Sequence, residues 1–117
     1  NDHSLIHLGD TGYTNDFKEI NKKLGAVDLA LIPIGAYAPR WFMKFSHMNP
    51  SEAVQSFLDL EATKAVGMHW GAFILTDEPV DEPPKMLEEE LVLKSIDKKL
   101  FITMKHGETI DLNNYQE

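Results

Sequence analysis

The sequence predicts an α/β fold, and three observations carry that prediction. Short apolar runs typical of buried strands alternate along the chain with segments that have the apolar spacing of amphipathic helices. Glycine, proline and helix-capping residues separate the two kinds of segment. The resulting order is strand, helix, strand, helix, strand, helix, strand, which is typical of short strands joined by helical crossovers that cover a sheet.

The first third of the chain is expected to form a strand, a helix and a second strand. The strand-like run 4–8 ends in a turn of small and polar residues, Gly9-Asp10-Thr11-Gly12. Thr14 or Asn15 is a suitable N-cap for the helix, whose apolar positions lead to a terminal glycine: Phe17, Ile20, Leu24 and Gly25. The continuous apolar run 28–34 indicates a strand buried on both faces.

The rest of the chain is expected to form helix, strand, helix and strand. Asn49-Pro50-Ser51-Glu52 places a capping side chain, a proline at the first helical position and a carboxylate three residues after the cap. The stripe that follows is apolar: Ala53, Val54, Phe57 and Leu58. Short strands are predicted at 65–69 and 101–104, with a helix between them that begins near Asp81-Glu82-Pro83-Pro84. That helix carries an apolar stripe and an acidic, solvated face: Leu87, Leu91, Val92 and Glu88 to Glu90.

Composition limits the classes of function. The chain has 117 residues, with 11 Lys and Arg against 19 Asp and Glu and a formal net charge of −8. This length fits one domain, and a hydrophobic content of 43% with 26% charged residues is that of a folded globular chain. An acidic chain lacks the surplus of cations that releases counterions from a phosphate backbone, so we expect no nucleic-acid partner.

The sequence shows no membrane or targeting segment. Its apolar runs fall far short of the roughly 20 residues that span a bilayer, and no basic segment followed by an apolar one opens the chain. The chain begins at Asn1 rather than at a methionine, so we expect that an N-terminal part was removed or that the chain is a piece of something longer. A cytoplasmic location is expected, with peripheral membrane attachment of the intact protein as the alternative.

Polar side chains follow three of the predicted strands at the points where those strands end. They are Asp10 after the first strand, residues 37–40 after the second and His69 after the third. The carboxyl ends of strands in open α/β sheets are where ligands gather. Because the chain has no cysteine, any metal must be held by histidines and carboxylates, a set that suits zinc or manganese.

Each of these residues also has an alternative, structural interpretation. Asp10 could simply cap its own turn, and His69 could be a buried, hydrogen-bonded histidine. His47, in a loop before a helix, is by default solvated or a cap, and His7 could point into the same cleft as Asp10 by strand alternation. A nearby apolar cluster is expected in the core or at an interface: Trp41, Phe42, Met43 and Phe45. Residue patterns alone therefore predict a possible metal site with two ligands, Asp10 and His69, and give no further ligand.

Four sequence blocks resemble the metallo-β-lactamase superfamily, in its order and at about its spacing. The blocks are Gly9-Asp10-Thr11-Gly12-Tyr13, the run from Ile32 to Lys44, His47-x-x-Pro50-x-Glu52-Ala53, and His69-Trp70-Gly71. Within that superfamily the chain is similar to the branch of N-acyl-phosphatidylethanolamine-hydrolysing phospholipase D and its bacterial relatives. The resemblance covers nearly the whole chain. It implies the C-terminal half of an αββα sandwich, with a short mixed sheet and helices, as a single domain over residues 1–117.

The resemblance also implies roles for individual residues. Asp10 matches the aspartate that bridges two metal ions in the family, and His69 matches a terminal ligand of the second metal. His47 matches a histidine beside the site, where it would bind substrate or transfer a proton. Tyr37 and Arg40 would line the entrance. The implied cofactor is zinc, two per intact site, with manganese or iron as alternatives.

The family's His-x-His-x-Asp-His block is missing from this sequence, so most of the implied metal ligands are missing as well. We therefore expect part of a metal-dependent hydrolase of phosphodiesters, phospholipids or lactones, inactive alone and partnered by the missing N-terminal half. The alternative is a non-catalytic interaction or assembly module. A homo-oligomer is expected because a lone half would expose an apolar sheet face, with the candidates for that face or the one under the helices being Val27, Leu29, Leu31, Val66 and Met68. A haloacid-dehalogenase-type phosphatase is excluded because no Asp-x-Asp motif is present.

Overall fold

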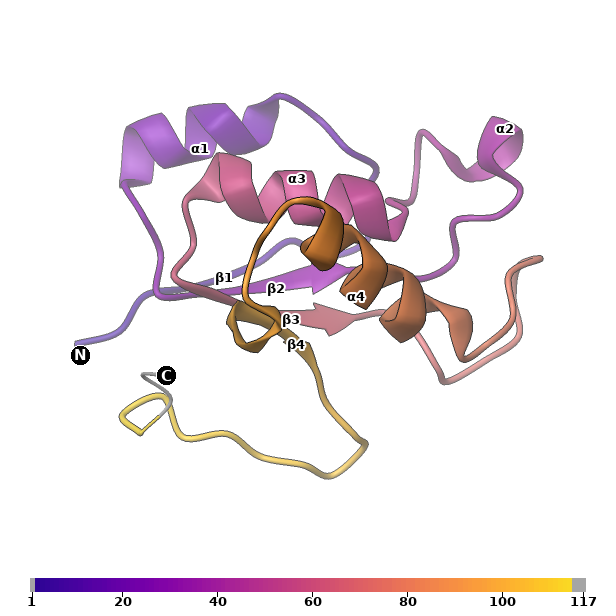
Figure 1. The fold of residues 1–117 in the computed structure, drawn as a ribbon. Coiled ribbons are helices and arrows are strands. Elements are labelled where there is room, and N and C mark those ends of the chain that lie inside the picture. The colour runs from indigo at the N-terminus through magenta and orange to yellow at the C-terminus, as the bar shows by residue number, and fades with distance from the viewer. Residues whose placement is uncertain (1, 115–117) are drawn as a thin grey trace.

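The computed structural model describes residues 2–114, which form four strands on one side of a layer of helices (Figure 1). The strands are β1 (Leu5–His7), β2 (Leu29–Pro33), β3 (Lys64–Met68) and β4 (Phe101–Thr103). The helices are α1 (Asp16–Leu24), α2 (Arg40–Met43), α3 (Pro50–Leu60) and α4 (Glu82–Leu93), with a 3-10 turn η1 (Lys98–Leu100). None of these helices is long and apolar enough to cross a membrane.

The sheet is parallel throughout the described residues, in the order β1-β2-β3-β4. Ile6 pairs with Ala30, Ala30 with Ala65 and Ala65 with Phe101, so one row of side chains crosses all four strands. The expected α/β fold is confirmed, but the expectation of a mixed sheet is wrong. Each connection passes through a helix before the next strand pairs, and such a crossover returns the chain in the same direction.

Helices α1, α3 and α4 all lie on the same face of the sheet (Figure 1). The core forms between this face and the helices, where the Phe57 and Phe101 rings pack with centroids 5.5 Å apart and planes tilted by 54°. Its members come from every strand but the short β1 and from all three helices: Phe17, Val27, Ala30, Ile32, Ile34, Met48, Ala53, Val54, Phe57, Leu60, Ala62, Ala65, Leu87, Leu91 and Phe101. Of the two edge strands, β4 contributes the buried Phe101, whereas β1 contributes only the partly buried Ile6.

The predicted start of α3 is confirmed in atomic detail. The Asn49 side chain accepts a hydrogen bond from the Glu52 backbone N–H at 2.8 Å, and the Glu52 carboxylate accepts one from the Asn49 N–H at 3.2 Å. Pro50 occupies the first helical position, where a missing N–H costs nothing. Gly25 ends α1 with φ 79°, as expected of a terminal glycine. The sequence analysis did not predict α2 or η1, which are too short to show a helical period.

The apolar residues expected on an uncovered sheet face are mostly buried. Val27 belongs to the helix-side core, and Leu29 and Val66 are also buried, so only Leu31 and Met68 are partly exposed. Large exposed apolar side chains instead gather on two segments at the carboxyl edge of the sheet: Trp41, Phe42, Phe45, Phe73, Ile74 and Leu75. The cluster was expected in the core or at an interface. The core position is wrong for the three aromatic residues of the first segment, because α2 stands away from the sheet (Figure 1), and the interface position stays a prediction.

Candidate metal centre

Three side chains from distant parts of the chain meet at the carboxyl edge of the sheet. Asp10 follows β1, His47 precedes α3 and His69 follows β3. The Asp10 Oδ1 atom lies 2.8 Å from Nδ1 of His47 and 3.7 Å from Nε2 of His69. The two imidazole rings lie 5.4 Å apart and are tilted by 30°. The structure therefore brings together the three residues to which the sequence analysis gave metal or catalytic roles.

The donor atoms of this trio fit a divalent cation. One ligand atom from each residue lies within 4.8 Å of the other two. The His47 side chain is only 15% exposed, and its Nδ1 lies at ion-pair distance from Oδ1 of Asp10. Within the described residues His47 can therefore pair with Asp10 without binding a metal itself. Imidazole nitrogen and carboxylate oxygen are ligands that zinc accepts.

The Asp10 loop is shaped by its neighbours in β1 and by a close approach to the His47 segment. The Gly9 N–H donates to Nδ1 of His7 at 3.0 Å, and Gly9 has φ 68°, in the left-handed region. His7 therefore supports the turn from outside the trio and does not point into the site. A Cβ atom at Gly12 would lie 2.6 Å from the backbone oxygen of Phe45, so only glycine lets the two segments approach this closely.

The backbone of β3 and of the segment after β2 positions His69. His69 has φ 62°, which is uncommon for a residue with a side chain and turns the chain sharply at the end of β3. The Ile34 N–H donates to the Met68 oxygen at 3.0 Å and extends the sheet pairing up to His69. A Cβ atom at Gly35 would lie 2.2 Å from the His69 oxygen. The position of His69 is thus set by backbone contacts.

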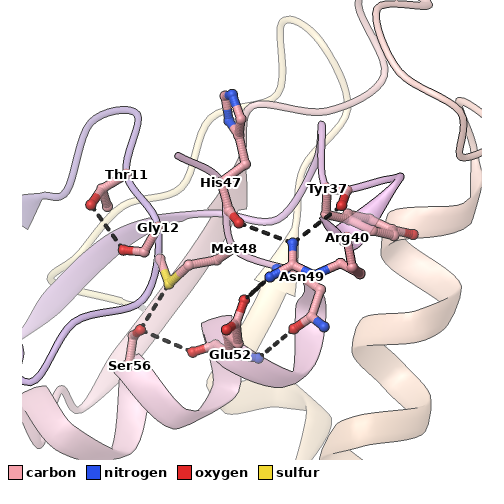
Figure 2. A network of polar contacts seen from close by, with 9 residues as sticks. All are labelled: Thr11, Gly12, Tyr37, Arg40, His47, Met48, Asn49, Glu52 and Ser56. Atoms are coloured by element: carbon pink, nitrogen blue, oxygen red, sulfur yellow. Dashed lines mark hydrogen bonds and ion pairs between the residues drawn. The ribbon is translucent and has the colours of Figure 1, made fainter. Parts of the chain in front are cut away.

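A hydrogen-bond network involving α2 and α3 positions the backbone of His47 (Figure 2). The His47 N–H donates to the Met43 oxygen at 2.9 Å, and the His47 oxygen accepts from Nη1 of Arg40 at 3.0 Å. The next residue, Met48, is fully buried and its sulfur accepts from the Ser56 hydroxyl at 3.0 Å. Figure 2 shows the His47 ring pointing away from this network while its carbonyl points into it.

Comparison with known proteins decides the family. The family model described as "Beta-lactamase superfamily domain" matches residues 1–70, more than half of the chain. This chain belongs to the metallo-β-lactamase superfamily. A metallo hydrolase from the hyperthermophilic archaeon Ignicoccus hospitalis shares the fold, with a TM-score of 0.62 and 24% identity over 93% of this chain and 41% of that chain.

Three of the curated relatives that the chain matches are named as hydrolysing enzymes. N-acyl-phosphatidylethanolamine-hydrolyzing phospholipase D 1 of Caenorhabditis elegans is 45% identical over 86% of this chain and 29% of its own length. The mitochondrial enzyme of that name from Saccharomyces cerevisiae is 45% identical over 72% of this chain and 18% of its own length. A UPF0173 metal-dependent hydrolase of Nitratidesulfovibrio vulgaris is 32% identical over 97% of this chain and 42% of its own length. The chain thus spans less than half of each of these relatives.

The side chains of Tyr37 and Arg40 are directed toward groups of the fold. The Tyr37 side chain is buried, and burial raises the pKa of its hydroxyl, as do the nearby carboxylates of Glu82 and Glu78. The Arg40 guanidinium turns inward to backbone oxygens and to Glu52. The family resemblance implies that both residues line the entrance, and this stays a prediction. The sequence showed their place after β2 but not the direction of their side chains.

Tyr13 supports the loop that carries Asp10, and the sequence analysis gave it no role of its own. Its hydroxyl donates a short hydrogen bond to the Asp59 carboxylate on α3. This hydrogen bond, together with burial and the negative charges of Asp59 and Glu52, raises the pKa of Tyr13 to about 12. Because Tyr13 follows the Asp10 turn, the contact ties that turn to the same helix that anchors the His47 segment. Only its place beside the Gly-Asp-Thr-Gly motif could have drawn attention to it.

A cavity of about 360 Å³ opens beside His69. The Glu78 carboxylate accepts hydrogen bonds from the N–H groups of Ala36 at 2.7 Å and Ala38 at 2.9 Å, which fastens the segment after β3 to the segment after β2. The wall of the cavity is largely apolar, with Trp70, Phe73, Ile74, Leu75 and Val80 among its residues. An apolar group next to the trio would therefore be accommodated there.

Proposed function

We propose that this chain is the C-terminal part of a metal-dependent, phospholipase D-like phosphodiesterase, and that Asp10, His47 and His69 are its share of the active site. The observation that carries the proposal is the convergence of these side chains from three separate loops, with donor atoms within 4.8 Å of one another. The curated relatives named as phospholipases of the D type support the reaction class. The apolar cavity beside His69 supports a substrate with an apolar portion.

In this proposal Asp10 and His69 hold metal, and zinc is the ion that fits their oxygen and nitrogen donors best. Divalent cations in paired sites activate water as a nucleophile and neutralise charge on phosphoryl oxygens. Three protein ligands and an open position are usual at catalytic zinc, so two ligands from this chain need others. The missing N-terminal half of the fold would supply them.

His47 acts on the substrate in this proposal. Its ring is partly buried, points away from the network that fixes its backbone, and lies beside Asp10. Such an imidazole can donate a hydrogen bond to a phosphate oxygen or give a proton to the leaving oxygen, and general acid catalysis contributes roughly 10² to 10⁴ in rate. His47 and Asp10 are the catalytic residues proposed here, and His69 is a metal ligand.

The test compares two alanine variants of the intact hydrolase. His47→Ala should lower kcat for phosphodiester hydrolysis by about 10² to 10⁴ and leave the metal content unchanged, because His47 acts on substrate. His69→Ala should lose activity together with one metal per site, measured by elemental analysis. His3→Ala is the matched control and should retain both, because His3 is exposed and precedes β1, at the opposite edge of the sheet from the trio. Equal metal loss in both site variants would make His47 a ligand, and full activity in His47→Ala would refute its catalytic role.

The 117-residue chain alone should bind zinc weakly and in less than stoichiometric amount. Asp10 and His69 are too few ligands to hold a zinc ion firmly. Calorimetric titration should therefore show a binding isotherm without saturation at micromolar metal, and Asp10→Ala should abolish even this signal. Tight binding of two ions per chain would contradict the division of ligands proposed here.

The exposed apolar side chains favour a second function, assembly with a partner that covers them. Trp41 is 81% exposed and Phe45 85%, which is unusual for large apolar residues of a free domain. The N-terminal half of the fold or a second copy of the chain could cover part of this surface. Sedimentation velocity on the chain alone should show a dimer at high concentration, and a folded monomer under those conditions would count against self-assembly.

A further inference from the structure

We infer that Arg40 is a positioning residue that acts on the reaction through His47. The inference rests on the proposed function, because it assigns Arg40 a part in the same active site. It differs from the role that the sequence analysis gave Arg40, which was to bind substrate at the entrance. The basis is the set of contacts made by the Arg40 guanidinium, all of which lie within the fold (Figure 2).

The backbone of His47 is held at both of its polar groups by α2. Its N–H donates to Met43 at the end of that helix, and its oxygen accepts from Arg40 at the beginning. Nδ1 of the imidazole has no hydrogen-bond partner within residues 2–114, and its polar contact there is the approach to Oδ1 of Asp10 at 2.8 Å. That contact depends on where the backbone places the ring, and Arg40 provides one of the two hydrogen bonds that fix that backbone.

The guanidinium group spans three acceptors at once. Nη1 donates to the Tyr37 oxygen at 3.2 Å and to the His47 oxygen at 3.0 Å, while Nη2 donates to Oε1 of Glu52 at 2.5 Å. Planar donors on two nitrogens suit this arrangement, whereas the ammonium of a lysine is a single point charge on a flexible stem. Substitution by lysine would preserve the charge but would not reach all three acceptors.

Glu52, which accepts a hydrogen bond from Arg40, is itself held in place by other hydrogen bonds. It belongs to the capping box of α3, where the same oxygen that receives Arg40 also accepts from the Asn49 N–H. The Arg40 and Glu52 side chains are 31% and 24% exposed, so water screens the pair only in part. Arg40 therefore connects the His47 loop to the first turn of α3, which is a core helix.

The alternative is direct contact between Arg40 and an anionic substrate. Three of the five N–H donors of the Arg40 guanidinium already donate to groups of the fold, and the side chain is only 31% exposed, so at most two donors are left for a substrate. The two alternatives predict different kinetics. Loss of a substrate contact raises KM, whereas misplacement of a catalytic histidine lowers kcat.

A double-mutant cycle in the intact hydrolase distinguishes positioning of His47 from direct contact between Arg40 and the substrate. With wild-type His47, Arg40→Lys should lower kcat for phosphodiester hydrolysis about tenfold with KM unchanged within about twofold, because small displacements of a catalytic group are costly. In the His47→Ala background the same substitution should change kcat by less than about twofold. Lys44→Gln, which removes an exposed positive charge from the same segment, is the matched control and should leave kcat unchanged. Urea unfolding of each variant identifies any loss of kcat that comes only from unfolded protein.

The outcomes are distinct. Equal effects of Arg40→Lys on kcat in both backgrounds, or a rise in KM in both, would overturn the inference and leave the proposed function intact. Loss of kcat that matches the unfolded fraction would also overturn it, by making Arg40 purely structural. An intact wild-type protein that, loaded with zinc, hydrolyses no phosphodiester would overturn the proposed function, and the role of Arg40 in the reaction with it.

Discussion

The two histidines of the trio are held by different means. His69 follows β3 directly, and backbone pairing and a backbone contact at Gly35 fix its place. His47 lies in a loop whose place depends on side chains: the Arg40 guanidinium, the capping box of α3 and the buried Met48. The difference teaches that the His69 position belongs to the sheet, while the His47 position can be altered without disturbing the sheet.

Among the substitutions that test this difference, Gly35→Ala is expected to lower the free energy of unfolding most. The new Cβ would lie 2.2 Å from the His69 oxygen, and the sheet hydrogen bond from Ile34 to Met68 prevents the two strands from moving apart. We expect a loss of about 3 kcal/mol in the free energy of unfolding, at the upper end of overpacking costs. Urea denaturation measures it.

Gly71→Ala is the control for Gly35→Ala. Gly71 follows His69 closely and has φ 75°, but a Cβ there meets nothing within 4 Å. Only the backbone conformation of the alanine is strained, so we expect the free energy of unfolding to fall by about 1 kcal/mol. If Gly35→Ala cost no more than this control, backbone contact would not be what fixes His69.

Gly12→Ala should have a smaller effect on stability and a local effect on the His47 side of the site. Its Cβ would lie 2.6 Å from the Phe45 oxygen, but residues 44–46 are exposed and can shift. We expect a loss of about 1 to 2 kcal/mol, with amide chemical shifts that change around His47 and not around His69. Shift changes spread equally over both segments would contradict the separation drawn here.

The smallest effect is a pH dependence that comes from Tyr13. Its pKa is about 12 in the folded chain against an ordinary value of 10.0, so the protonated hydroxyl favours folding. That contribution is complete below pH 10 and is lost as the pH rises from about 10 to about 12. The stability difference between wild type and Tyr13→Phe should therefore be constant at neutral pH and should shrink near pH 11, by urea denaturation. An unchanged difference at pH 11 would mean that the bond to Asp59 does not hold the Asp10 turn.

Sequence reasoning reached most of the fold and the membership of the trio. Periodicity and caps depend on neighbouring residues, so strands, three of the helices and the capping box at Asn49 and Glu52 could be predicted. Asp10 and His69 followed from their place at strand ends, because parallel strands bring those ends together. His47 needed the family resemblance, since a histidine in a loop has no distinctive local pattern.

From the sequence one can predict the main strands, three of the helices and the polar residues that share one edge of the sheet. The three-dimensional fold was needed to learn that the described strands are all parallel, that Trp41 and Phe45 are exposed, and that Arg40 turns inward to Glu52. This division follows from the range of the interactions. Helical period and capping act over a few residues, whereas the direction of a loop side chain depends on acceptors that the fold brings to it from elsewhere in the chain.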